Sequence, residues 1–170
     1  MIMTEEQKNH YFDWAATSPS DEQILKEAFD ETINLWGNPS SLHSLGKEAK
    51  KKLEEAREIC AKALNLPAEK LYFTSGGTES DHIPILSVLN KPQKGTVLFS
   101  SIEHPAILNT MQYLEQEEGY RVTYLPVDEN GQIRLDALRE ALCEETILVS
   151  IMYVNNETGA ILPLEEISKI

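Results

Sequence analysis

The chain has 170 residues, of which 41% are apolar and 25% charged, a composition typical of a globular domain with one well-filled core. Its net charge of −13, from 15 basic and 28 acidic residues, argues against nucleic acid and anionic membranes, which both need a basic footprint. The longest apolar run, at 147–154, is far shorter than the roughly 20 residues of a membrane span. No secretory leader is recognisable, so we expect a cytoplasmic protein with no membrane partner.

The first third of the chain is predicted to be helical. We predict that residues 1–20 form an N-terminal segment, which is disordered up to His10, and that residues 21–170 form the main domain. Ser20 and Gln23 have the spacing of a capping box and predict the start of a helix. A longer amphipathic helix follows, and its apolar face is predicted to consist of Leu45, Ala49, Leu53, Ala56, Cys60 and Ala63.

A glycine turn then joins a predicted short strand, Leu71–Phe73, to a predicted helix. Gly76 and Gly77 let the backbone turn sharply, and the free amides of a helix that begins near Thr78 would point at an anion such as phosphate. An ordinary connection between a strand and a helix fits the same pattern. The P-loop lysine and the three-glycine dinucleotide fingerprint are absent. Pro84 predicts that the helix kinks or starts later.

Beyond this turn, strand and helix patterns alternate. Strands are predicted at 96–100, 121–125 and 147–154, and helices from Pro105, around 136–142 and near Pro163. Such alternation indicates βαβ units and a mostly parallel sheet with helices on both faces. The predicted fold class is therefore α/β, in a three-layer αβα arrangement.

Polar residues gather in the loops that leave the carboxyl ends of the predicted strands, where open α/β sheets bind ligands. His104 precedes a helix, where the dipole disfavours its charged form, so it could stack on a ligand, transfer protons or simply cap the helix. Asn155 and Asn156 could bind a ligand or shape a turn. The three loops are predicted at 74–78, 101–104 and 155–159.

Two cysteines, Cys60 and Cys143, have no metal-binding or redox spacing, and no metal site is predicted. Both fall in helical patterns away from the strand-end loops. We predict that they are lone thiols facing the core and that neither is a nucleophile.

Five motifs occur together in one order, and from Tyr11 to Ile170 the chain resembles the N-terminal part of cysteine desulfurases of the NifS/IscS type. These are pyridoxal-phosphate (PLP) enzymes of the class V aminotransferase family. Trp14 stands where the family usually has Asn, and Pro84 lies in a helix start that is usually free of proline. The motifs are YFDWAAT, NPSSLHSLGKEA, FTSGGTES, SIEHPAIL and VNNETGAILPLEEI.

The resemblance implies a PLP site. Gly77 and Thr78 match the positions that hold the PLP phosphate, and His104 matches the catalytic histidine that stacks on the pyridine ring and helps to move protons. Asn156 matches the asparagine that contacts the ring hydroxyl, with Asn155 as the alternative if the register differs by one residue. The chain would then be part of the large domain of a fold-type I PLP-dependent transferase.

The implied activity removes sulfur from L-cysteine to give L-alanine and an enzyme persulfide, for sulfur transfer such as iron-sulfur cluster assembly. Such enzymes are homodimers, and a sulfur acceptor or scaffold protein is a further possible partner. The lysine that binds PLP covalently and the nucleophilic cysteine lie beyond the point that matches Ile170. We therefore expect a longer enzyme, of which this piece alone is inactive. The alternatives are another class V enzyme, such as a selenocysteine lyase or an aminotransferase, and a non-catalytic binding module.

Overall fold

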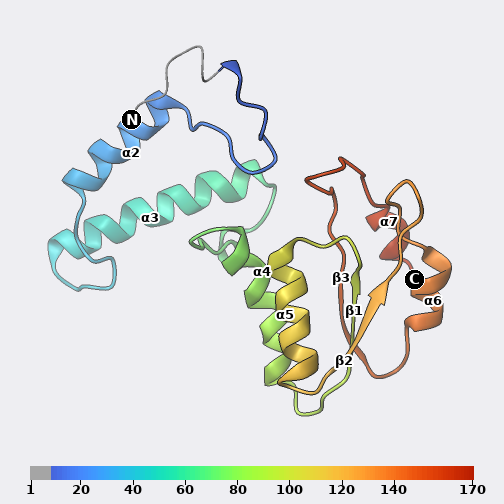
Figure 1. Cartoon of the computed structure of the whole chain (residues 1–170). Coiled ribbons are helices and arrows are strands. Elements are labelled where there is room, and N and C mark those ends of the chain that lie inside the picture. Colours follow the sequence, from blue (N-terminus) through green and yellow to red (C-terminus); the bar gives the residue numbers. More distant parts are fainter. Residues whose placement is uncertain (1–8) are drawn as a thin grey trace. The chain divides into compact units, whose positions relative to one another are not determined.

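The computed structural model describes residues 9–170, which form two compact units (Figure 1). The first unit ends at Phe73 and the second comprises Thr74–Ile170. Most of the predicted disordered start, up to His10, lies outside the described residues. The domain boundary predicted near residue 20 stays a prediction.

Helix α2, Glu22–Asn34, begins one residue later than the capping box predicted. Its N-cap is Asp21, whose Oδ1 accepts hydrogen bonds from the amides of Gln23 at 2.9 Å and Ile24 at 3.0 Å. A carboxylate satisfies two free amides and opposes the positive end of the helix dipole. Asp21 therefore replaces Ser20 as the residue that starts the helix.

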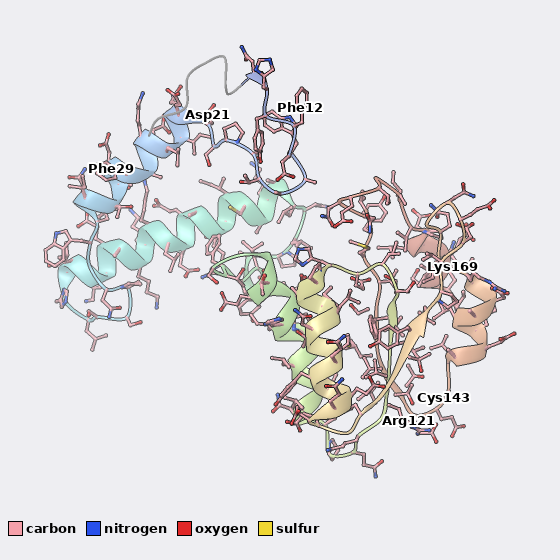
Figure 2. The ribbon with its side chains drawn as sticks, viewed as in Figure 1. Phe12, Asp21, Phe29, Arg121, Cys143 and Lys169 are labelled. Atoms are coloured by element: carbon pink, nitrogen blue, oxygen red, sulfur yellow. The ribbon has the colours of Figure 1, made fainter. Side chains whose placement is uncertain are left out.

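Helix α2 has an apolar face that no core covers within the described part of the first unit. Phe29 is 65% exposed, and Figure 2 shows it extending from the helix. None of the residues of α2 is buried. The exposed apolar side chains of this face are Ile24, Leu25, Phe29 and Ile33.

Helix α3, Ser44–Ala63, begins in a tight turn that explains part of the motif around it. His43 caps the helix, and its Nδ1 accepts a hydrogen bond from the amide of Gly46 at 3.2 Å. A Cβ on Gly46 would lie 2.5 Å from the carbonyl oxygen of Ser41 and 2.7 Å from that of Asn38. Only glycine fits this close backbone approach.

The strand predicted at Leu71–Phe73 is wrong. After the short 3₁₀ helix η1, Ala68–Lys70, the backbone of Leu71 is extended, but residues 71–73 pair with no strand among the described residues, and Tyr72 is exposed. The carbonyl of Leu71 instead accepts a hydrogen bond from Arg57 Nη1 at 2.6 Å. An apolar sequence favours a strand, but a strand also needs a neighbour for its backbone groups.

The second unit contains a sheet of three strands that is parallel, as predicted, and the strand order is β2-β1-β3. Strand β1 is Thr96–Ser100, β2 is Arg121–Leu125 and β3 is Thr146–Ser150. Every residue of β1 is buried, because this strand has a neighbour on each side and helices on both faces. Strand β3 ends before Val154, where the sequence pattern placed its end.

Helices cover both faces of this sheet, which confirms the three-layer αβα prediction (Figure 1). Helices α4, Gly77–Leu86, and α5, Pro105–Gln116, lie on one face. Helices α6, Leu135–Ala141, and α7, Leu164–Ile167, lie on the other. Side chains of β1 alternate between the two cores, as a strand requires. The first core contains Val97, Phe99, Ile107, Met111 and Leu114, and the second contains Leu98, Leu125, Ile133, Leu138 and Leu162.

Pro84 predicted that helix α4 kinks or starts later, and the later start is wrong. The helix begins at Gly77, runs through Pro84 to Leu86 and is followed by a 3₁₀ turn, η2, Ser87–Asn90. Proline removes only the bond to the carbonyl one turn earlier, and the helix ends soon after it. Within residues 9–170 no helix is long and apolar enough to cross a membrane.

The prediction that both cysteines face the core is wrong, since Cys60 and Cys143 are exposed. The buried side of α3 consists of Gly46, Ala49 and Ala61, which excludes Cys60. Cys143 follows α6 instead of lying in it, at the end of the sheet where β2 and β3 begin (Figure 2). Cys143 therefore does not lie at the carboxyl ends of the strands.

Replacing Leu98 by alanine tests the layered core. Leu98 is 0% exposed, so Leu98→Ala should lower the free energy of unfolding by about 2–5 kcal/mol, through lost burial and the cavity that remains. Ile161, which is 60% exposed, provides the control, and Ile161→Ala should cost less than about 1 kcal/mol. Urea unfolding measures both, and equal losses would contradict the assigned core.

Candidate functional site

The carboxyl ends of β1 and β3 lie side by side, and the chain leaves them toward opposite faces of the sheet. After β1 it continues into α5 on one face, and after β3 it continues into α7 on the other. Such a divergence leaves a crevice above the strand ends, which is where open α/β sheets bind ligands. The loops that flank it here are residues 101–104 and 151–163.

The start of α4 presents backbone amides that no side chain caps. Gly76 is the N-cap and supplies no side-chain acceptor, and the first intrahelical bond of α4 comes from Ser80. The amides of Gly77, Thr78 and Glu79 therefore have no capping partner among the described residues. Helices α2, α3 and α5 are each capped by a side chain. Among these four helices, α4 has the start best suited to an anion.

Open space lies beside these amides. A Cβ added to Gly76 or to Gly77 would meet no atom within 4 Å. The φ angle of Gly76, 164°, is extended backbone that any residue can adopt. Neither packing nor backbone conformation within the described chain thus requires glycine here, and a ligand has room to approach the amides.

Hydrogen bonds within the loop hold the start of α4 in place. The carboxylate of Glu79 accepts a bond from the amide of Ser75 at 2.6 Å, and this bond lowers the pKa of Glu79. The hydroxyls of Thr74 and Ser80 are 2.6 Å apart. Glu79 therefore stays ionised near neutral pH and is engaged with the loop.

His104 is the N-cap of α5. Its Nδ1 accepts a hydrogen bond from the amide of Ala106 at 3.1 Å, so this nitrogen carries no proton. The side chain is exposed, and its other ring nitrogen has no partner among the described residues. The capping interpretation is thus confirmed, while the ring face and Nε2 stay available to a ligand.

The two asparagines after β3 have different environments. Asn155 is 7% exposed, and its Oδ1 accepts bonds from the amides of Glu157 at 3.0 Å and Thr158 at 2.9 Å. Its Nδ2 donates to the carbonyl of Ile102 at 3.0 Å. Asn156 is exposed. Asn155 therefore shapes the turn, and Asn156 is the one whose amide can reach a ligand.

The structure brings the three predicted loops into one unit. Thr78 and Ala106 line a common groove of about 470 Å³ between α4 and α5. The bond from Asn155 to Ile102 links the loop after β3 to the loop that carries His104. Sequence reasoning missed Glu103, which is buried at 4% exposure in that same loop. An acid in the short loop between an apolar strand and a helix-starting His-Pro pair was the available signal.

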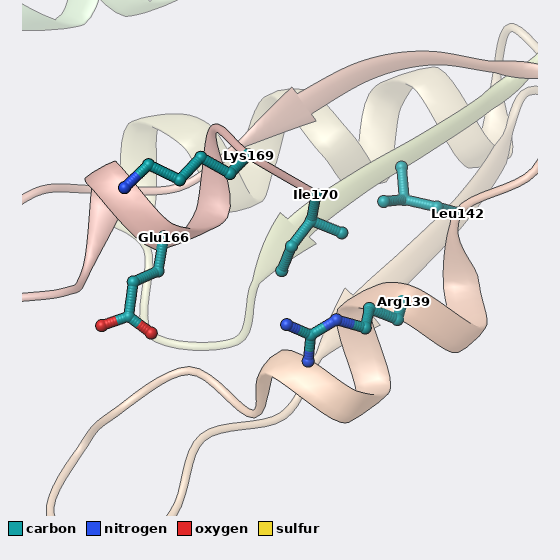
Figure 3. Close-up of a pocket in the computed structure, with 5 residues that line it drawn as sticks. All are labelled: Arg139, Leu142, Glu166, Lys169 and Ile170. Atoms are coloured by element: carbon teal, nitrogen blue, oxygen red, sulfur yellow. The ribbon is translucent and has the colours of Figure 1, made fainter.

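A second pocket, of about 550 Å³, contains none of the predicted site residues (Figure 3). Arg139 of α6 and Leu142, the residue after that helix, line it, as does Glu166 of α7. The remaining lining residues are Lys169 and Ile170. Its charged lining residues are two cations and one acid, of mixed sign. No group of three metal-binding side chains occurs within residues 9–170.

Solved structures with this fold define the class of the domain. A NifS-like protein superposes with a TM-score of 0.84 at 38% identity, over 91% of this chain and 43% of that one. A structure described as SspA in complex with cysteine gives a TM-score of 0.86 at 35% identity, over 94% of this chain and 46% of that one. The fold is therefore that of the NifS-like α/β domains.

Sequence comparison identifies the family. Residues 10–170 match the aminotransferase class V family. The chain is 42% identical over 165 residues to the cysteine desulfurase IscS of Clostridium botulinum, and the match covers 96% of this chain and 41% of that relative. It is 41% identical over 162 residues to the putative cysteine desulfurase IscS 1 of Bacillus subtilis, over 94% of this chain and 42% of that relative. The chain belongs to the class V aminotransferase family, and it spans about two fifths of these relatives.

Alanine substitutions distinguish the two asparagines. Asn155→Ala removes a buried amide with several partners and should lower the free energy of unfolding by about 1–3 kcal/mol. Asn156→Ala, at an exposed position, should change it by less than about 0.5 kcal/mol. Chemical denaturation measures both variants. A larger loss for Asn156→Ala would reverse the assignment.

Proposed function

We propose that this chain is part of the PLP-binding domain of a cysteine desulfurase, which releases L-alanine from L-cysteine and passes the sulfur on as an enzyme persulfide. The uncapped start of α4, with open space beside Gly76 and Gly77, is the observation that carries the proposal. Relatives described as cysteine desulfurases, and a solved relative in complex with cysteine, support the substrate. When bound, PLP supplies an electron sink for bond cleavage next to the substrate amine.

Gly77 and Thr78 would hold the phosphate of PLP. Their amides and the Thr78 hydroxyl are donors at the positive end of the α4 dipole, which favours an anion. The net charge of −13 provides no general attraction for phosphate, so these local dipoles have to supply it. The open space beside the glycines fits a phosphate that rests on the backbone.

His104 and Asn156 would hold the ring of the cofactor. The cap on α5 fixes the imidazole of His104, which leaves its face for stacking and Nε2 for holding or moving a proton. The exposed amide of Asn156 would donate to the ring hydroxyl. Both roles come from the family resemblance, and the atoms they need, Nε2 of His104 and the side-chain amide of Asn156, are exposed to a ligand.

The wider setting is also proposed from the family. We expect a cytoplasmic homodimer that works with a sulfur-acceptor or scaffold protein in sulfur transfer such as iron-sulfur cluster assembly. We expect the lysine that binds PLP and the nucleophilic cysteine outside these 170 residues, because in the family both lie beyond the position that matches Ile170, and Cys143 lies at the other end of the sheet from the strand-end loops.

Two alternatives remain. A selenocysteine lyase or an aminotransferase of class V would share the cofactor loops, and a substrate screen on the natural protein distinguishes them. The exposed apolar face of α2 favours a second alternative, a non-catalytic module that binds a partner there. Absence of turnover on any amino acid by the PLP-loaded natural protein would support that module.

Thr78→Val tests the phosphate site. The variant removes a hydroxyl donor at nearly constant shape, so the affinity of the natural protein for PLP should fall by about 10-fold or more. The affinity for pyridoxal, which lacks the phosphate, should not change. Absorbance titration measures both ligands, and Thr123→Val in β2 is the matched control. Equal losses for PLP and pyridoxal would place the phosphate elsewhere.

His104→Gln tests the proton-transfer role. In the natural protein this variant should retain PLP but form alanine from L-cysteine about 10²–10⁴-fold more slowly, because the ring nitrogen is lost. Alanine quantification by mass spectrometry measures the rate. The 170-residue chain on its own should form no alanine. Wild-type turnover by His104→Gln, or alanine formation by the chain alone, would contradict the proposal.

A further inference from the structure

Glu103 is a buried acid at the point where the predicted loops meet. It lies between β1 and α5, directly before His104, and is 4% exposed. Long acidic side chains are rarely buried unless their oxygens are paired. Its burial therefore needs a local explanation.

The carboxyl of Glu103 joins the ends of two strands through one oxygen. Its Oε1 accepts a hydrogen bond from Ser100 Oγ, at the end of β1, at 2.7 Å. The same atom accepts one from the amide of Met152, just beyond β3, at 2.6 Å. Together with the bond from Asn155 Nδ2 to Ile102, this contact fastens the loop after β3 to the turn that carries His104.

This arrangement is unfavourable for the carboxyl itself. Its second oxygen, Oε2, is buried and has no partner among the described residues. Burial raises the pKa of Glu103, against the opposing effect of the bonds from Ser100 and Met152, and the charge of Asp81 on α4 raises it further. An apolar side chain would fill the same space without this cost, but it could not accept the Met152 amide.

We propose that Glu103 is a positioning residue, whose carboxyl holds the loop that carries Asn156 against the turn that carries His104, so that both side chains reach the same ligand. This inference rests on the proposed function, because the ligand in question is the cofactor ring. Without Glu103 the Met152 amide loses its acceptor, and the bond from Asn155 Nδ2 to Ile102 is left to hold the two loops together, so their relative position becomes less fixed. The amides of Gly77 and Thr78 belong to α4 and keep their place.

The loop link is tested first in the natural protein without PLP. Hydrogen–deuterium exchange at the Met152 amide should become about tenfold faster or more in Glu103→Ala, because its acceptor is gone. Exchange should stay at the wild-type rate in Glu103→Gln, whose side-chain carbonyl can accept both bonds. An unchanged rate in a folded Glu103→Ala protein would overturn the link.

Positioning is then tested in the PLP-loaded natural protein. Glu103→Ala should lower kcat for L-cysteine about tenfold and shift the absorption band of the bound cofactor, while the affinity for PLP changes little. Glu103→Gln should restore the wild-type kcat and band. A purely structural role would lower the folded fraction and leave both properties unchanged per bound PLP, and that result would overturn the proposal.

Glu103→Asp replaces Glu103→Ala if the alanine variant fails to fold. Its carboxyl is one methylene shorter and cannot reach both donors, so its kcat should fall below that of Glu103→Gln. Equal kcat values in the Asp and Gln variants would overturn positioning. Failure of the proposed function is separately visible, because wild-type protein would then bind no PLP or release no alanine, while the exchange experiment would still test the loop link.

Discussion

The parallel pairing of β1 with both of its neighbours is the constraint on which the rest of the second unit depends. Because β1 lies between β2 and β3 and points the same way, the loops after β1 and β3 emerge at one edge of the sheet. The two apolar cores hold β1 there through alternate side chains, Val97 and Phe99 on one face and Leu98 on the other. His104 and the asparagine turn are adjacent because of this pairing, although some fifty residues separate them in the sequence.

A strongly acidic chain can still offer an anion site when the attraction is local. Side chains cap α2, α3 and α5, whereas α4 begins at Gly76 without a side-chain cap, as do the shorter helices α6 and α7. Helix α4 fixes the amides at its start, and the hydrogen bond from the Ser75 amide to the Glu79 carboxylate holds the loop before them. These amides therefore need no reorganisation to receive a phosphate. The dipole of α4 acts within about one helical turn of its start. The attraction for a phosphate there is set by these nearby amides and not by the net charge of the whole chain.

Much of this fold follows from local sequence, and the exceptions have physical reasons. The strands at 96–100 and 121–125 and the helix from Pro105 were predicted, because apolar runs and a proline at a first helical position act over a few residues. Leu71–Phe73 has the composition of a strand but no neighbour to pair with, and pairing is not a local property. Cys60 follows the helical period, yet the buried side of α3 is set by small residues. Of the candidate site, the loops, the glycines and the choice of Asn156 over Asn155 came from the sequence, whereas the buried Glu103 did not, because burial depends on the tertiary fold.

A crystal structure of the natural protein grown with PLP is the most direct test of the account. The account predicts the phosphate within hydrogen-bond distance of the Gly77 and Thr78 amides, with the ring of the cofactor against the imidazole of His104. A phosphate bound elsewhere, or a ring that does not meet His104, would contradict it.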